Sequence, residues 1–139
     1  MRHAARRGPG RLLVALTVLA LSGCGPSVPA EGEQGREVAT RFLEELRAGK
    51  VEEAWRGTSS EFKSLMGEQS LRDYVKAHPA LRAPAEYAEG RKTAFNGQRL
   101  AEHVFRGTTL VRKKSNPATI RVLLAPAANG PKVERVTVE

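Results

Sequence analysis

The sequence predicts an α+β domain in which N-terminal helices pack on a curved, mostly antiparallel four-stranded sheet. Three observations predict this class. Apolar residues recur at helical spacing between residues 36 and 78, they alternate at strand spacing after residue 84, and short turn sequences divide the strand-rich half. Because the helices precede the strands, the two kinds of element are expected to form separate layers. A chain of 139 residues has room for one domain, which we place at residues 36–139.

The first helix is predicted over residues 36–49. Gly49 suits its C-terminal end, because glycine readily adopts the left-handed conformation found there. A second, short helix over residues 50–55 is expected to bring Trp55 into the core. The apolar stripe of the first helix consists of Val38, Ala39, Phe42, Leu43 and Leu46.

Two further helices are predicted from their capping residues. Residues 58–61 read as a capping box, with Thr58 as the N-cap and the glutamate three residues later reaching back to it. The last helix covers residues 70–78 and takes Ser70 as its N-cap. Pro79 ends it, since the residue before a proline disfavours the helical conformation.

Four strands with short connections follow. The dipeptide Asn96-Gly97 is the sequence most typical of a two-residue hairpin turn. Gly107 interrupts the second strand, where we expect a β-bulge, and residues 115–117 (Ser-Asn-Pro) are predicted to form the next turn. The strands are predicted at residues 87–95, 99–113, 118–124 and 132–138.

The N-terminal 35 residues have a different character. Four arginines precede an apolar run over residues 12–23, and residues 1–30 contain no acid. This is the pattern of a secretory signal peptide, which we assign to residues 1–23. The run is shorter than the ~20 residues of a membrane-spanning helix, and a retained membrane anchor is the alternative. Residues 24–35 are rich in Gly, Pro and Glu and are predicted to be a flexible linker that begins with Cys24.

The residues Leu21-Ser22-Gly23-Cys24 resemble the lipobox of bacterial lipoprotein precursors. The resemblance implies that the Cys24 thiol receives a diacylglycerol, that the signal is cut between Gly23 and Cys24, and that a further acyl chain such as palmitate is added. It also implies anchoring in the cell membrane or the outer membrane, on the periplasmic or extracellular side. Cys24 is the only cysteine, so no disulfide can form within the chain.

The phrase "FLEELRAGKVEEAW" (42–55), the helix end "AHPAL" (77–81) and the four-strand meander resemble small bacterial lipoproteins of the nuclear transport factor two-like superfamily, also called cystatin-like α+β or SnoaL-like. The resemblance covers residues 36–138. It implies a cone, in which helices pack on the concave face of a bent sheet and leave a cavity. That cavity is an isomerase or cyclase site in some relatives, and a binding pocket or a packed core in others.

We assign no catalytic and no cofactor-binding residue. Trp55, Tyr74 and His78 are candidate pocket residues. The alternative for Trp55 and Tyr74 is that they pack in the core as ordinary aromatic side chains. The alternative for His78 is that its positive charge stabilises the C-terminus of a helix. His103 lies in mid-strand, and we favour an orientation toward solvent, with the cone interior as the alternative. A metal site is not expected, because the lone cysteine is assigned to lipidation and only two histidines follow it.

Charge is divided unevenly between the two halves. Residues 31–89 hold 9 Lys and Arg against 12 Asp and Glu, whereas residues 90–139 hold 10 against 3. Because alternate strand residues share a face, many of these cations are expected on the convex face of the sheet. Nucleic acid is not an expected partner, since the basic half lacks interleaved aromatic residues and the chain is expected to be exported.

Three functions follow from these patterns. The leading one is a non-enzymatic, lipid-anchored domain that binds an envelope protein or a small apolar ligand. The alternatives are an isomerase- or cyclase-like enzyme acting on an apolar substrate in the cone, and an electrostatic adaptor to anionic envelope surfaces. The oligomeric state stays open.

Overall fold

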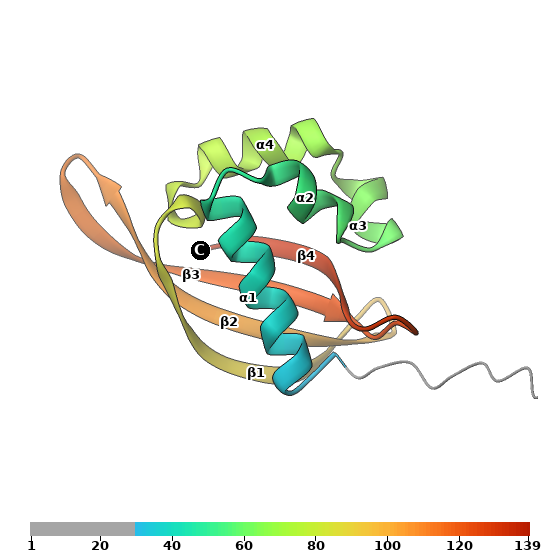
Figure 1. The fold of residues 1–139 in the computed structure, drawn as a ribbon. Coiled ribbons are helices and arrows are strands. Elements are labelled where there is room, and N and C mark those ends of the chain that lie inside the picture. The colour runs from blue at the N-terminus through green and yellow to red at the C-terminus, as the bar shows by residue number, and fades with distance from the viewer. Residues whose placement is uncertain (1–29) are drawn as a thin grey trace, which may run out of the picture.

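The computed structural model describes residues 30–139 and confirms the α+β class, with helices followed by an antiparallel four-stranded sheet. The strands lie in the sheet in chain order, and the sheet is not closed, so the first and last strands are its edges (Figure 1). The elements are α1 (Glu33–Arg47), α2 (Val51–Arg56), α3 (Ser60–Leu65), α4 (Glu68–Ala77), the 3₁₀ turn η1 (Pro79–Arg82), β1 (Ala85–Phe95), β2 (Gln98–Val111), β3 (Lys114–Ala125) and β4 (Lys132–Val138).

The signal peptide expected at residues 1–23, the lipidation expected at Cys24 and the linker residues 24–29 lie outside the described residues. Within the rest of the expected linker, α1 already begins at Glu33, three residues before its predicted start. Ala30 is 1% exposed and belongs to the core. The prediction of a flexible linker therefore fails for residues 30–35, which are part of the folded domain.

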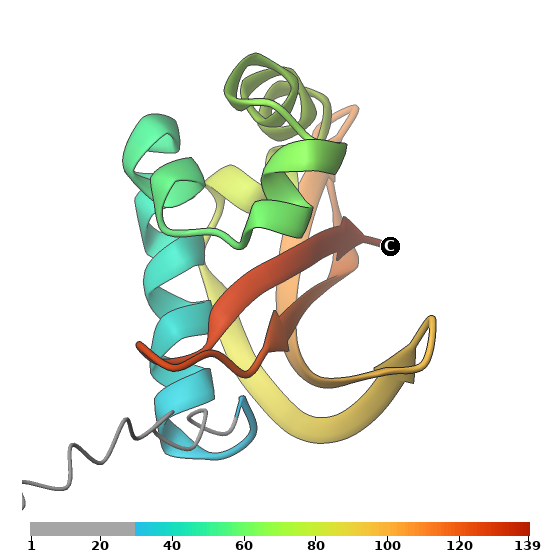
Figure 2. The ribbon, with the colours of Figure 1, turned by 90° about the vertical axis from the view of Figure 1, so that its right-hand side faces the viewer.

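The sheet curves strongly around the helical layer, and α1 lies across its concave face (Figures 1 and 2). One long side chain reaches from one edge strand to the other: the Arg135 guanidinium of β4 lies 4.2 Å from the ring centroid of Phe95 of β1. Side chains fill the concave face. The core joins residues of α1 and β3, with side chains of α2 and α4 at its margin; among them are Phe42, Leu46, Trp55, Tyr74, Ile120 and Val122.

The helix caps differ from those predicted by one or more residues. Ser59 rather than Thr58 caps α3, because the Ser59 Oγ accepts the Phe62 N–H at 3.0 Å while the Thr58 hydroxyl donates to the Trp55 carbonyl at 2.6 Å. Gly67 precedes α4, which places Ser70 inside that helix rather than at its start. The sequence offers several hydroxyl residues close together, and tertiary packing selects among them.

The strand boundaries also differ from the prediction. The turn between β2 and β3 falls at Arg112 and Lys113, so residues 115–117 lie within β3. Gly107 pairs regularly with both neighbouring strands and forms no bulge. The irregularities lie instead at Ala88 in β1 and at Glu134 in β4, which the pairing skips.

Candidate functional site

An apolar groove lies where α3 and α4 meet the edge strand β4. It has a volume of about 290 Å³. Leu65, one of the lining residues, is 70% exposed and adds apolar surface to the groove. We call this the edge groove, and its lining residues are Phe62, Leu65, Met66, Tyr74, Glu134, Arg135, Val136 and Thr137.

Two hydrogen bonds hold α3 and the segment after it beside β4. The Ser59 N–H donates to the Val133 carbonyl at 2.9 Å, which joins the start of α3 to the start of β4. The Trp55 Nε1–H donates to the Met66 carbonyl at 2.9 Å, which fixes the loop between α3 and α4. The Phe62 ring, set by the Ser59 cap, packs edge-on against Phe42 at 6.1 Å and forms the floor of the groove.

Glu134 places a carboxylate in this apolar setting. Because β4 is bulged at Glu134, its side chain departs from the in–out alternation of the strand. Its Oε2 atom is buried and accepts no hydrogen bond from any residue between 30 and 139. A buried carboxylate oxygen without a donor is unfavourable, so the groove is chemically suited to a ligand that supplies an N–H or a cation.

The groove adjoins unpaired backbone. Thr119 and Glu139 exchange both backbone hydrogen bonds, at 2.8 and 2.9 Å, which sets the alternation along β4. In an antiparallel pair the next residue points its N–H and C=O the other way, so Val136 and Val138 direct theirs to the open edge. An open edge of this kind is a template for another strand.

The structure brings only part of the predicted pocket together. Tyr74 lines the edge groove rather than a cavity inside the cone. Trp55 is half-buried and is not among the lining residues, but its Nε1–H donates to the carbonyl of Met66, which is. His78 is absent from the lining. Its ring lies against Tyr74 with 4.0 Å between centroids, and its Nδ1 lies 2.8 Å from the Tyr74 carbonyl, where it closes the C-terminus of α4. Glu134 was missed, because a bulge cannot be read from a strand-like sequence.

His103 is fully buried, so its predicted orientation toward solvent is wrong. Its Nε2 lies 3.0 Å from the Ala30 carbonyl oxygen, and its Nδ1 lies 3.2 Å from the Tyr87 hydroxyl. Since a carbonyl only accepts, Nε2–H donates to Ala30 and Nδ1 accepts from Tyr87. Both ring nitrogens are thus occupied, and His103 is a structural residue.

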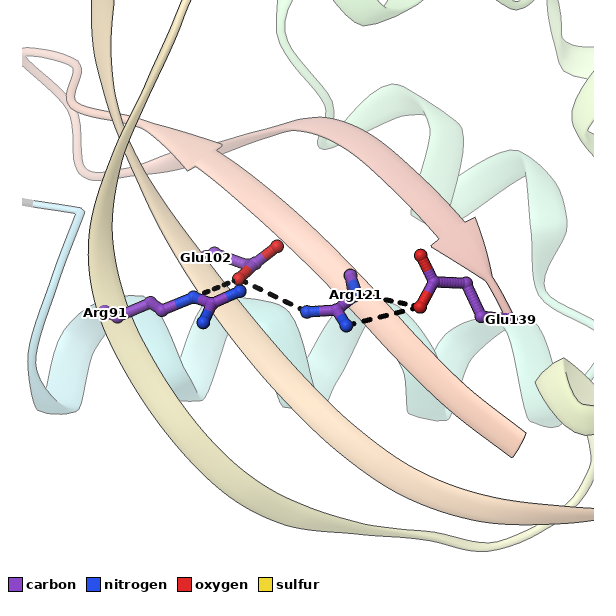
Figure 3. Close-up of polar contacts among 4 residues, drawn as sticks. All are labelled: Arg91, Glu102, Arg121 and Glu139. Carbon is purple, nitrogen blue, oxygen red and sulfur yellow. Dashed lines mark hydrogen bonds and ion pairs between the residues drawn. The ribbon is translucent and has the colours of Figure 1, made fainter. Parts of the chain in front are cut away.

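The convex face carries fewer free cations than the sequence predicts. Glu102 on β2 accepts from Arg91 on β1 and from Arg121 on β3, and Arg121 continues to Glu139 at 3.2 Å (Figure 3). Hydrogen bonding and charge attraction from Glu139 raise the pKa of the Arg121 guanidinium further above its ordinary value. This cross-strand ladder pairs two arginines with two glutamates.

Among residues 30–139, no three histidine, cysteine or acidic side chains gather as a metal site would require. Within the same residues, the helices are all too short or too polar to span a bilayer. Compared with protein-family models, with curated proteins and with solved structures, the chain gives no match. The nuclear transport factor two-like resemblance therefore stays a prediction.

Proposed function

We propose that this protein is a lipid-anchored cell-envelope module whose edge groove binds an extended segment of a partner protein. The anchoring part rests on the lipobox-like residues that end at Cys24. The binding part rests on one observation: an apolar groove of about 290 Å³ runs beside the unpaired edge of β4.

The filled concave face directs binding to the edge. Phe42, Leu46 and Ile120 occupy the space that a hollow cone would leave open. Phe42 also borders an open depression of about 260 Å³ beside α1 and α2, whereas the space beside Ile120 measures about 50 Å³. This is smaller than the several hundred Å³ of a typical small-molecule site. The edge groove is larger and open, which suits side chains that project from a strand.

The chemistry of the groove describes its ligand. A strand added along β4 gains backbone hydrogen bonds at Val136 and Val138. Alternate side chains of that strand would face Leu65, Met66 and Phe62 and are expected to be apolar. One lysine, arginine or other donor is expected opposite Glu134, where it would satisfy the buried Oε2.

Peptide selection tests this proposal. A random library of extended peptides is selected against the full chain, and we expect a consensus of alternating apolar residues with one basic residue. Val138→Pro removes an outward N–H from an edge position that tolerates proline, and should weaken the selected peptides by about tenfold. Glu134→Gln should remove the basic preference. Glu86→Gln on the opposite edge strand is the control. Peptides that bind the Val138→Pro protein equally well would exclude strand addition.

The anchor is tested separately. Mass spectrometry of the protein from its native membrane should find a diacylglycerol-modified Cys24 at the N-terminus. Cys24→Ser should release the protein from the membrane fraction while leaving peptide binding unchanged. An unmodified thiol would refute the anchor alone.

One observation keeps the isomerase or cyclase alternative: a carboxylate, Glu134, and a phenol, Tyr74, line the same groove. This is the pair that proton transfer next to an oxyanion requires. A panel of apolar carbonyl compounds should then raise the melting temperature. For a compound that binds and turns over, Glu134→Gln would abolish turnover while leaving binding.

A further inference from the structure

The strands β2 and β3 extend beyond the helical layer as a two-stranded ribbon (Figure 1). We call residues 106–118 the β2–β3 arm. Every residue from 106 to 117 is exposed or half-exposed, so the arm adds little to the core. We propose that the β2–β3 arm docks on an anionic lipid bilayer.

All the charged residues of the arm are basic. Residues 103–133 contain no Asp or Glu, and the arm itself carries Arg106, Arg112, Lys113 and Lys114. The cross-strand ladder on the convex face ends before the arm, at Arg121 and Glu102. The four cations have no ion-pair partner among residues 30–139. Such a cluster attracts an anionic surface.

Two aliphatic side chains accompany the cations. Leu110 is 72% exposed and Val111 is 52% exposed, directly before the turn. They lie on opposite faces of the ribbon, since adjacent strand residues alternate. Exposed aliphatic residues beside Lys and Arg suit the boundary between headgroups and acyl chains, where long basic side chains reach the phosphates.

The turn itself favours a role outside folding. Arg112 and Lys113 adopt φ values of 50° and 65°, a conformation that disfavours residues with side chains. The other long hairpin of this sheet adopts nearly the same angles with Asn96 and Gly97, at 49° and 77°, which are the favoured residues. Two basic residues therefore stand at turn positions where folding alone would favour Asn and Gly. Backbone strain of this kind is often found at functional sites.

A bilayer fits this surface better than a protein partner does. A stable protein interface buries ~800 Å² on each side and usually centres on a pocket or an aromatic anchor. The arm contains no aromatic residue, and its two exposed aliphatic side chains lie on opposite faces of the ribbon. The arm lies at the opposite end of the sheet from the start of α1 (Figure 1).

The first test reads the environment of the arm directly. A polarity-sensitive fluorophore is attached to Ser115→Cys, which faces Leu110 across the ribbon, in the full chain. Vesicles of phosphatidylcholine with phosphatidylglycerol should shift its emission to the blue, pure phosphatidylcholine should not, and salt should reverse the shift. A label at Ser64→Cys on α3 and the identically treated parent chain are the controls. No shift at residue 115, or an equal shift at residue 64, would overturn the proposal.

The second test separates binding from folding. Arg112→Asn with Lys113→Gly should keep or raise the melting temperature, while partition onto anionic vesicles falls by ~25-fold. Lys50→Gln with Arg82→Gln removes the same charge elsewhere on the surface and should leave partition nearly unchanged. Equal losses in both double variants would indicate bulk charge and refute the arm. A blue shift with polyglutamate but not with vesicles would identify an acidic protein partner instead.

Discussion

The imidazole of His103 donates a hydrogen bond of 3.0 Å to the Ala30 carbonyl, across 73 residues of sequence. This bond joins the segment before α1 to the middle of the sheet. The Tyr87 hydroxyl donates to the second ring nitrogen at 3.2 Å, and the Arg36 guanidinium lies 4.4 Å from the centre of the Tyr87 ring. We call this set of contacts among Ala30, Arg36, Tyr87 and His103 the histidine clamp.

Two glycines make room for this clamp. A Cβ atom on Gly35 of α1 would lie 1.7 Å from the Ala30 carbonyl oxygen and 2.7 Å from His103 Nε2. A Cβ on Gly90 of β1 would lie 2.5 Å from the Tyr87 hydroxyl oxygen. Neither glycine has a positive φ, so both are required for close approach rather than for a turn.

The first prediction concerns Gly35→Ala. In an ordinary helix this change stabilises by roughly 0.5–1 kcal/mol. Here the new methyl group meets backbone, and we expect a net loss of about 1–3 kcal/mol in the free energy of unfolding, measured by urea denaturation. Gly57→Ala is the control, since its Cβ would meet neighbours at an ordinary 3.6 Å. Equal stability of the Gly35→Ala and parent proteins would mean that the clamp does not form.

The second prediction ranks the partners of the clamp. His103→Leu leaves the buried Ala30 carbonyl without a donor and the Tyr87 hydroxyl without an acceptor, and should lower the free energy of unfolding by about 2–5 kcal/mol. Tyr87→Phe removes one hydrogen bond and should cost about 1 kcal/mol. Chemical denaturation of both variants measures the difference. A smaller loss for His103→Leu than for Tyr87→Phe would contradict this arrangement.

The third prediction concerns pH. Burial raises the pKa of the Tyr87 phenol above its ordinary value near 10, and the positive charge of Arg36 opposes this shift in part. The folded state therefore keeps the proton to higher pH than the unfolded state. This contribution to stability is complete below about pH 10 and is lost as the pH rises through the folded pKa.

Ultraviolet titration of phenolate checks this directly. The chain has 2 tyrosines, and one should ionise at higher pH than its free value. Tyr87→Phe should remove that late step. If Tyr87→Phe keeps the late ionisation step, the step does not belong to Tyr87 and the prediction is wrong.

The fourth prediction tests the cross-strand ladder. Glu102 is largely buried between Arg91 and Arg121, whereas Glu52 forms an exposed pair with Arg56 on α2. Glu102→Gln removes the charge that two arginines share and should lower the melting temperature more than Glu52→Gln does. High salt should reduce the effect of both, and that of Glu52→Gln more completely, because exposed pairs are screened first. Calorimetry at low and high salt measures this.

The fifth prediction distinguishes the observed helix cap from the predicted ones. Ser59→Ala removes the acceptor for the Phe62 N–H and should cost about 1 kcal/mol. Ser70→Ala lies inside α4 on an exposed face and should be neutral or slightly stabilising, because alanine is the better helix former. Thermal melts of the two variants should differ in sign. A loss at Ser70→Ala as large as that at Ser59→Ala would favour the cap predicted from sequence.

Local sequence determined the class of the fold and the position of most elements. Helical spacing of Phe42 and Leu46 predicted α1, and the alternation of Ile120, Val122 and Leu124 predicted a strand that is buried on one face. These predictions hold because periodicity and burial are properties of neighbouring residues. The hairpin at Asn96-Gly97 holds for the same reason, since those two residues adopt its angles at little cost.

Turn and cap positions were less determined. Arg112 and Lys113 carry no turn signal, whereas Ser115, Asn116 and Pro117 do, so the turn was placed three residues too late. The long pairing between β2 and β3 decides this register, because a shift of one residue would turn every side chain to the other face.

The sequence by itself determined the order of helices before strands and the excess of cations in the second half, and it predicts a leader with a lipobox-like end. Only the tertiary structure decided that His103 is buried against Ala30, that Glu134 is left without a donor beside the open edge of β4, and that two of the sheet arginines are paired. The physical reason is the separation along the sequence between the residues that make contact. Spacing along the chain records contacts within a turn or two, whereas these side chains meet partners from strands and segments far away in sequence.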